Sequence, residues 1–275
     1  MSTTEQALFG CPAPFLDEAP VSWICRLALS QASTPEEITK LLGLGGKRDL
    51  DVKFSRLSMD WVSDLCGLDR GCFAASHAVL TSYDRVYRQA PEMLLSMEGV
   101  PRFRYCPVCL GGQLTAYFPV QWKFATWSYC PAHGCFMENH CERCLAPLVL
   151  PRDLGEIVAN NREYLSLRNC GRCGNDMSKR EPCLVAEFIP MLADWEQMLM
   201  TNGRASISAF YHGYLTIKGW RGKRNIKEVL KLRDKGALHF HGYRLDADVV
   251  RRRQQTPRAV NTFRSISHPM VRTDL

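Results

Sequence analysis

The stretch CPAHGCFMENHCERC, residues 130–144, contains six side chains that can bind a metal ion. Thiolate and imidazole donors in a four-coordinate arrangement favour zinc, and a structural zinc site takes four of them. Six donors are too many for one such site, so the sequence on either side must show how they divide. The six are Cys130, His133, Cys135, His140, Cys141 and Cys144.

Two pairs of donors, each with two residues between its members, define a first predicted site. CPVC supplies Cys106 and Cys109, and CPAH supplies Cys130 and His133. This spacing lets one tight turn aim both side chains at a single point, and a gap of about twenty residues between pairs suits a zinc ribbon. The gap contains TAYFPVQWKFATWSY, residues 115–129, which is rich in aromatic and β-branched residues. We therefore expect strands there.

A second predicted site follows directly and uses two C-x-x-C pairs: Cys141, Cys144, Cys170 and Cys173. In CGRCG we expect Gly171 and Gly174 to relieve the turn at the second pair. Four pairs of this spacing in one region indicate two structural zinc ions per chain. Cys135 and His140 are then left over, and residues 130–144 form a seam that holds half of each site.

Both predicted ligand sets are complete fours, which argues against a catalytic zinc, because catalytic sites keep one position open for water. The sequence also lacks an H-E-x-x-H helix, a P-loop, a G-x-S-x-G elbow and the H-x-E deaminase arrangement. We therefore expect no catalytic residues and no enzyme activity. His239 and His241 are weak metal candidates, and the remaining cysteines are expected to be small buried residues: Cys11, Cys25, Cys66, Cys72, Cys135 and Cys183.

The composition is that of a globular cytoplasmic protein. Of its 275 residues, 46% are hydrophobic and 23% are charged, which argues against general disorder. There is no run of apolar residues long enough for a membrane span, and the N-terminus does not resemble a secretory signal. Because the cytoplasm is reducing, the 13 cysteines indicate metal binding rather than disulfides, and their odd number supports this.

The positive charge is concentrated near the C-terminus. From Lys218 onward there are 15 Lys and Arg against 5 Asp and Glu, whereas the rest of the chain has 20 against 23. Such a basic block attracts phosphate backbones or an acidic protein face, although it can also be an ordinary solvated surface. The candidate contact residues for nucleic acid or a partner are Lys218, Arg221, Lys223, Arg224, Lys227, Arg251, Arg252 and Arg253.

The first hundred residues read as helices. VSWICRLALSQA, residues 21–32, has one apolar face, and Ser22 is placed to cap it. In STPEEITKLLGLGG, Thr34 and Glu37 form a capping box around Pro35, and a glycine ends the helix at Gly43. In residues 57–80 we expect a helix-turn-helix pair, with the turn at Gly67 and Asp69 as the second cap. The second helix carries few base-reading side chains, which favours a packing or protein-docking role.

Two further helices are expected beyond Cys183. VAEFIPMLADWEQMLM is amphipathic, interrupted by Pro190 and closed by Gly203. NIKEVLKLRDKGAL forms another helix that stops at Gly236. The tail from Val249 shows no sustained period, which predicts partial disorder.

The predicted fold is mainly α with small β zinc ribbons. A helical helix-turn-helix domain spans residues 1–100, and two tandem zinc-ribbon modules span residues 101–182. A C-terminal helical region with a basic tail spans residues 183–275.

The motifs RFRYCPVCL, CPAHG and CERC, with the Trp between the first two, resemble the signature of the TniQ family of transposon target-selection proteins. SWICRLAL and VSDLCGLDRGCF resemble the opening domain of that family, so the resemblance covers residues 21–173. Two positions differ from the usual family pattern. The stretch GGQLTAYFPVQW lacks the acidic residue and the Arg that members often carry there, and Cys135 replaces an aliphatic residue.

The resemblance implies a non-catalytic adaptor in transposition, acting in DNA recombination. Similar proteins connect a target-recognition element to an AAA+ ATPase regulator, which recruits the transposase. The recognition element is DNA or, in CRISPR-associated transposons, an effector complex with its guide RNA. Longer members have a further helical part used for DNA contact or for forming a homodimer. The alternative is a stand-alone zinc-dependent DNA-binding regulator. We also expect that alanine at Arg251, Arg252 and Arg253 weakens association with nucleic acid of any sequence.

Overall fold

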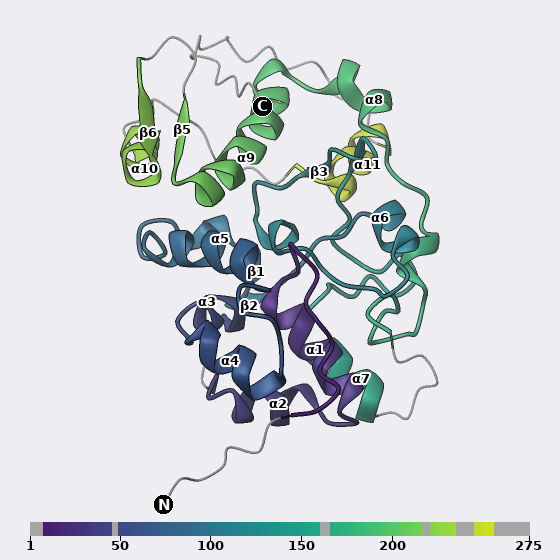
Figure 1. The fold of residues 1–275 in the computed structure, drawn as a ribbon. Helices are drawn as coiled ribbons and strands as arrows, with labels where there is room; N and C mark the ends of the chain where they lie inside the picture. The colour runs from purple at the N-terminus through teal and green to yellow at the C-terminus, as the bar shows by residue number, and fades with distance from the viewer. Residues whose placement is uncertain (1–7, 46–48, 160–165, 217–220, 235–244, 256–275) are drawn as a thin grey trace, which may run out of the picture.

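The computed structural model describes residues 8–45, 49–159, 166–216, 221–234 and 245–255, and helices dominate it (Figure 1). The α-helices in these residues are α1 (Pro20–Ser30), α2 (Pro35–Leu41), α3 (Leu50–Phe54), α4 (Met59–Cys66), α5 (Ala74–Asp84), α6 (Pro107–Gly112), α7 (Arg152–Ala159), α8 (Val185–Phe188), α9 (Asp194–His212), α10 (Ile226–Asp234) and α11 (Ala247–Gln255). Short 3₁₀ helices are η1 (Pro91–Met93), η2 (Val120–Lys123), η3 (Met177–Lys179) and η4 (Ile189–Met191).

The strands of the described residues form three separate antiparallel pairs. They are β1 (Ser96–Met97) with β2 (Val100–Pro101), β3 (Tyr129–Cys130) with β4 (Cys135–Phe136), and β5 (Tyr214–Thr216) with β6 (Lys223–Asn225). In the middle pair, Cys130 lies opposite Cys135. The structure is thus mainly helical with small sheets, as predicted.

The first helix has the predicted apolar face but a different start. Trp23 and Leu27 are fully buried. The helix begins at Pro20, however, so Ser22 lies within its first turn and does not cap it. The Ser22 hydroxyl instead donates to Glu18 at 2.8 Å and accepts from the Phe118 amide at 2.9 Å. This hydroxyl therefore joins α1 to a segment almost a hundred residues away in the chain.

The capping box predicted at α2 is present. The Thr34 hydroxyl accepts from the Glu37 amide at 3.2 Å, and the Glu37 carboxylate accepts from the Thr34 amide at 2.8 Å. Pro35 occupies the first turn, and Gly43 follows the helix with a φ of 64°. Local sequence was sufficient here because every contact spans only a few residues.

The predicted helix-turn-helix pair is only partly correct. Helix α4 ends at Gly67 in the left-handed conformation, as expected. Helix α5 begins only at Ala74, and Phe73 takes the cap position that we assigned to Asp69. The connection is therefore longer than the three- or four-residue turn of a DNA-binding pair. Helix α5 packs its Tyr83 ring against Phe210 of α9 at 5.8 Å, which agrees with a packing role.

The predicted end of the long helix at Gly203 is wrong. Helix α9 continues to His212, and Gly213, with a φ of 77°, terminates it. A Cβ added at Gly203 would lie 2.0 Å from the backbone oxygen of Thr126. The glycine thus permits close approach of α9 to another segment. Sequence alone does not distinguish this use from a helix stop.

We predict that Gly203→Ala destabilises the protein by about 2 kcal/mol or more, because the new methyl group meets a backbone oxygen that cannot rotate away. Gly155→Ala in α7 is the control, since nothing lies within 4 Å of its added Cβ. Urea unfolding of the three proteins measures the difference. Equal stability of the Gly203→Ala variant and the wild type would contradict the close approach.

The strands expected between the first two donor pairs are also absent, apart from β3 at the end of the stretch. Most of the stretch is irregular and contains η2. Its backbone bonds to two earlier segments of the chain: the Val120 amide donates to the Asp17 carbonyl at 2.7 Å, and the Ala125 amide donates to the Met93 carbonyl at 2.7 Å. Phe118 and Trp122 are buried edge to face at 5.6 Å. The aromatic residues therefore form core rather than sheet, because their packing partners come from other regions.

The largest apolar cluster joins all three predicted regions. It includes Val21 and Tyr83 from the first, Tyr105 from the second, and Phe210 and Val229 from the third. A smaller cluster, which includes Trp23 and Phe54, lies beneath the N-terminal helices. The division at residues 100 and 182 stays a prediction.

The C-terminal predictions have mixed outcomes. The helix expected in residues 225–238 is present as α10, while Gly236 lies outside the described residues. The tail was expected to lack regular structure, yet residues 247–255 form α11. Val250 of this helix is buried in a third apolar cluster with Phe136 and Phe188. Tertiary packing thus supports a helix whose own sequence has a weak apolar period.

Candidate metal centres

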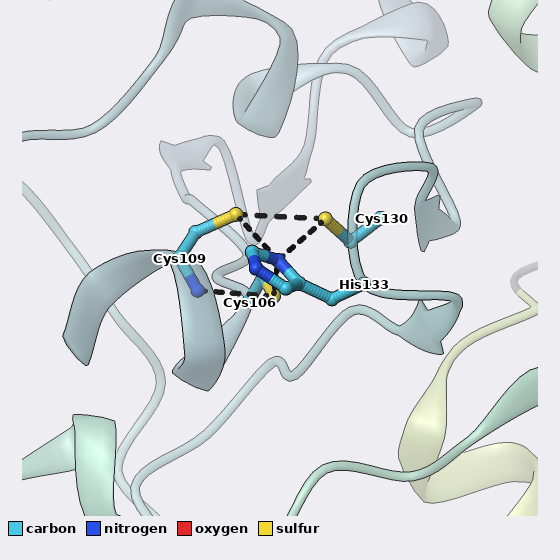
Figure 2. A group of neighbouring side chains, drawn as sticks. All are labelled: Cys106, Cys109, Cys130 and His133. Atoms are coloured by element: carbon cyan, nitrogen blue, oxygen red, sulfur yellow. Dashed lines mark hydrogen bonds between the residues drawn. The ribbon is translucent and has the colours of Figure 1, made fainter. Parts of the chain in front are cut away.

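The first predicted donor set comes together at one point (Figure 2). Cys106 precedes α6 and Cys109 lies within it, whereas Cys130 is in β3 and His133 is in the turn that follows. Figure 2 shows the sulfur atoms around the ring of His133. The Nδ1 atom of His133 lies 3.1 Å from Cys109 Sγ, 3.5 Å from Cys130 Sγ and 3.6 Å from Cys106 Sγ.

These distances match the edges of a tetrahedral zinc site. Zn–S bonds of about 2.3 Å and Zn–N bonds of about 2.0 Å place two sulfurs about 3.8 Å apart, and a sulfur and a nitrogen about 3.5 Å apart. The sulfurs of Cys109 and Cys130 are 3.5 Å apart. One ion at the centre would therefore reach all four donors, and a set of three thiolates and one imidazole suits zinc.

Local sequence explains how each pair is aimed. Pro107 is in the first turn of α6, and the Cys106 sulfur caps that turn by accepting from the Cys109 amide at 3.4 Å. In the second pair, the Gly134 amide donates to the Cys130 carbonyl at 2.9 Å, with a φ of 56° at Gly134. The hairpin of the centre thus lies across this second pair, where β3 meets β4. The sequence pattern instead predicts strands between the two pairs.

The thiols of this centre are too close to ionise together without a cation. The pKa of Cys106 is lowered, because hydrogen bonds from the thiols of Cys109, Cys130 and Cys135 stabilise its thiolate. The pKa of Cys109 is raised, because hydrogen bonds to the sulfurs of Cys106 and Cys130 and burial all favour its protonated form. A divalent ion among them would favour all the thiolates at once, which is the charge state that metal ligation requires.

The second donor set also converges. The sulfurs of Cys141 and Cys173 are 3.5 Å apart, and those of Cys144 and Cys170 are 3.6 Å apart. All four ligand atoms lie within 4.8 Å of one another. This set of four cysteines has the same tetrahedral spacing, so it also fits zinc.

The two glycines of CGRCG have different roles from each other. Gly174 has a φ of 73° and its amide donates to the Cys170 carbonyl at 2.8 Å, so it relieves the turn as predicted. Gly171 instead allows contact with the start of α7, since its added Cβ would lie 2.3 Å from the backbone oxygen of Asp153. The prediction for Gly171 is therefore corrected from turn relief to close approach.

The two left-over residues of the seam both have partners. Cys135 is fully buried, and its sulfur lies 3.4 Å from that of Cys106, so it contacts the first centre without belonging to the four-donor group. The β3–β4 hairpin, in which Cys135 lies opposite Cys130, brings Cys135 to the first centre. The His140 ring nitrogen Nδ1 lies 2.7 Å from a carboxylate oxygen of Asp248 in α11.

Cysteines outside the centres are unpaired thiols. Cys25 is fully buried in the core, and burial raises its pKa well above the ordinary value. Burial likewise raises the pKa of Cys66 to about 12 and that of Cys183 to about 11. These thiols stay protonated near neutral pH and are poor nucleophiles. His239 and His241 lie outside the described residues.

The basic candidates divide into two groups, and Lys218 lies outside the described residues. Arg221, Lys223 and Lys227 are exposed on the β5–β6 hairpin and α10. Arg224 is half-buried and lies 3.8 Å from Glu228.

Arg251 and Arg253 of α11 bind the carboxylates of Glu138 and Glu196, while Arg252 is exposed. Whether any of the basic candidates contacts nucleic acid stays a prediction.

Among the residues that the structure describes, these two groups are the ones in which three or more His, Cys, Asp or Glu side chains converge. They define a class of mainly helical proteins that contain small cysteine-rich modules, each with four donors able to hold a metal ion. Residues 10–137 match the model of the TniQ family.

The matching segment contains all four donors of the first centre. No curated protein matches the chain. None of the helices in the described ranges is both long and apolar enough to cross a bilayer.

Proposed function

We propose that the chain is a non-catalytic adaptor for target selection in transposition. It would link a target-recognition element to an AAA+ ATPase regulator in the cytoplasm, where its thiols remain available for zinc. The observation that carries the proposal is the family match over residues 10–137, together with a first donor set that lies wholly inside it. The complete four-donor sets support a structural role for the metal, since neither leaves a position for a reacting water.

The mechanism of such an adaptor is geometric. Zinc would hold Cys106, Cys109, Cys130 and His133 in the first module, and Cys141, Cys144, Cys170 and Cys173 in the second. Each ion cross-links turns that bury little apolar area by themselves, and so fixes the surfaces that meet partners. Leu145 belongs to such a surface. It directly follows Cys144, the side chain is 72% exposed, and the backbone φ is 56°.

Co-purification tests the adaptor role. The full chain, expressed with the AAA+ ATPase encoded next to it, is expected to retain that ATPase through two affinity steps. Cys130→Ser should abolish retention because it removes a first-centre ligand, whereas Lys40→Ala, an exposed position on α2, should not. A chain that binds no ATPase and no effector complex, yet binds duplex DNA at moderate salt, would contradict the adaptor proposal.

The genes that flank this one, with or without a CRISPR array, identify the recognition element to test. Size-exclusion chromatography of the purified chain tests for a homodimer.

The alternative function is a stand-alone zinc-dependent DNA-binding regulator, and one surface favours it. On the outward face of the β5–β6 hairpin, the Lys223 ammonium lies 3.9 Å from the ring centroid of Tyr214. Lys227 and Lys231 lie one turn apart on the exposed side of α10. Cations and an aromatic ring on a small protruding element suit a phosphate backbone without base selection.

For this surface we predict that Lys223→Ala and Lys227→Ala each weaken duplex binding equally for all sequences. The slope of log affinity against log salt should become shallower by about one per cation removed. Arg70→Ala, an exposed position on the connection before α5, is the charge-matched control and should leave the slope unchanged. Fluorescence anisotropy over a salt series measures it. If all three substitutions change the salt slope equally, duplex binding depends only on the net charge of the protein, which would contradict a binding surface on this hairpin and α10.

A further inference from the structure

Three consecutive residues of the seam between the metal centres each meet a different residue of the C-terminal segment. The Asn139 amide donates to Asp246, just before α11, and the His140 ring faces Asp248. The Arg251 guanidinium donates two hydrogen bonds to the Glu138 carboxylate, at 2.8 and 2.6 Å. Figure 1 shows α11, in yellow, against the β3 region. The seam therefore acts as a recognition surface for α11.

The centre of this contact is buried. Glu138 has no exposed surface, and Arg180 lies 3.1 Å from its carboxylate in addition to Arg251. Arg104, also fully buried, lies 3.6 Å from Asp246 and donates to Asn139 at 3.0 Å. Bidentate pairs between Arg and carboxylate in such surroundings are specific in geometry, and either partner left alone is strongly unfavourable.

A second attachment lies at the far end of α11. Arg253 binds the carboxylate of Glu196 through both of its terminal nitrogens. Glu196 is buried and also accepts from the Ala193 amide at 3.0 Å, at the start of α9. Next to Arg251, Val250 packs into the apolar cluster that includes Phe136 and Phe188. Helix α11 is thus held to the seam and to α9 at the same time.

We propose that α11 is an ionic clasp that joins the seam between the metal centres to α9, and that the docked clasp withholds Arg251 and Arg253 from phosphate. A guanidinium whose two terminal nitrogens both donate to a carboxylate has to release that carboxylate before the same pair of nitrogens can bind a phosphate. Arg252 is exposed and donates to the carbonyl of Asp248 in its own helix, so it is not part of the clasp.

This inference reverses, for Arg251 and Arg253, the role expected from their position in a basic tail. It does not rest on the proposed function, because the clasp is a contact within the chain. Substitution of Arg251 or Arg253 should therefore loosen α11 as much as substitution of its carboxylate partner does. Substitution of the neighbouring Arg252 should not.

Hydrogen exchange of the full, zinc-loaded chain tests the clasp, with amides of residues 245–255 followed by mass spectrometry. Arg251→Ala and Glu138→Gln should each raise exchange of this segment by about tenfold or more, and the double variant should add little further. Arg252→Ala, the matched control, should leave it unchanged. Similar exchange in all variants, or an equal rise with Arg252→Ala, would overturn the proposal.

Glu196→Gln and Arg253→Ala provide a second pair, far from the metal ligands, should Glu138→Gln fail to fold. They are expected to raise exchange in the same segment, and unchanged exchange in both would equally overturn the clasp. In the duplex-binding series, Arg251→Ala with Arg253→Ala should leave the salt slope of the wild type unchanged. A slope shallower by about two would show that the arginines already contact phosphate, which contradicts their retention in the clasp.

Discussion

Purified under reducing conditions, the intact chain should contain two zinc ions, and the Cys141→Ser variant should contain about one. Each donor group has its own four residues, and no donor is shared between the groups. A serine hydroxyl is a poor zinc ligand at neutral pH, so the second centre should be lost while the first is retained. The zinc content, measured by inductively coupled plasma emission spectroscopy and divided by the protein concentration, gives the number of ions per chain.

Cys135→Ser is the control for this experiment, and it should retain two ions. The Cys135 sulfur touches that of Cys106 but lies outside the four-donor group. The structural effect should be large as well, because structural zinc contributes about 10–16 kcal/mol to the folding of small modules. A chelator should therefore unfold the region around both centres. A single zinc in the intact chain, or two in Cys141→Ser, would contradict the division of donors.

The second large effect is expected at Lys123, where Lys123→Met should destabilise the protein by about 3–5 kcal/mol. The ammonium is 1% exposed, lies 2.5 Å from the Asp49 carboxylate and also binds Asp51. Asp51 in turn accepts from the Val21 amide at 2.6 Å. The nearby negative charges of Asp49 and Asp51 raise the pKa of Lys123 although burial opposes this, so the side chain stays charged.

Removal of the ammonium leaves two carboxylates close together in the interior, which accounts for the size of the expected loss. Urea unfolding measures it, and Lys40→Met, on the exposed side of α2, should change stability by less than about 0.5 kcal/mol. The double variant Lys123→Met with Asp51→Asn should lose less than the sum of the two single variants, because they share one interaction. Additive losses would show that the three groups do not form a unit.

Much of the candidate site could be predicted from sequence because its determinants are local. Each donor pair spans only two intervening residues, and the turn that aims it needs a proline, a glycine or a capping sulfur within the same few residues. The capping box at Thr34 and Glu37 succeeded for the same reason. Predictions failed where a residue's role depends on a distant segment. Gly203 and Gly171 were assigned to a helix stop and to a turn, and both instead allow contact with a backbone remote in the chain.

The sequence by itself determined the donor chemistry, its division into two groups and the family signature, since these depend on residue type and short spacing. Only the tertiary structure decided what surrounds the groups. It placed Cys135 against Cys106, and it paired Glu138 and His140 with α11 more than a hundred residues away. Side-chain pairing over such distances leaves no periodic or spacing signal in the chain, because it depends on how separate elements pack. The seam that divides the metal donors is also, for that reason, the surface to which the C-terminal helix docks.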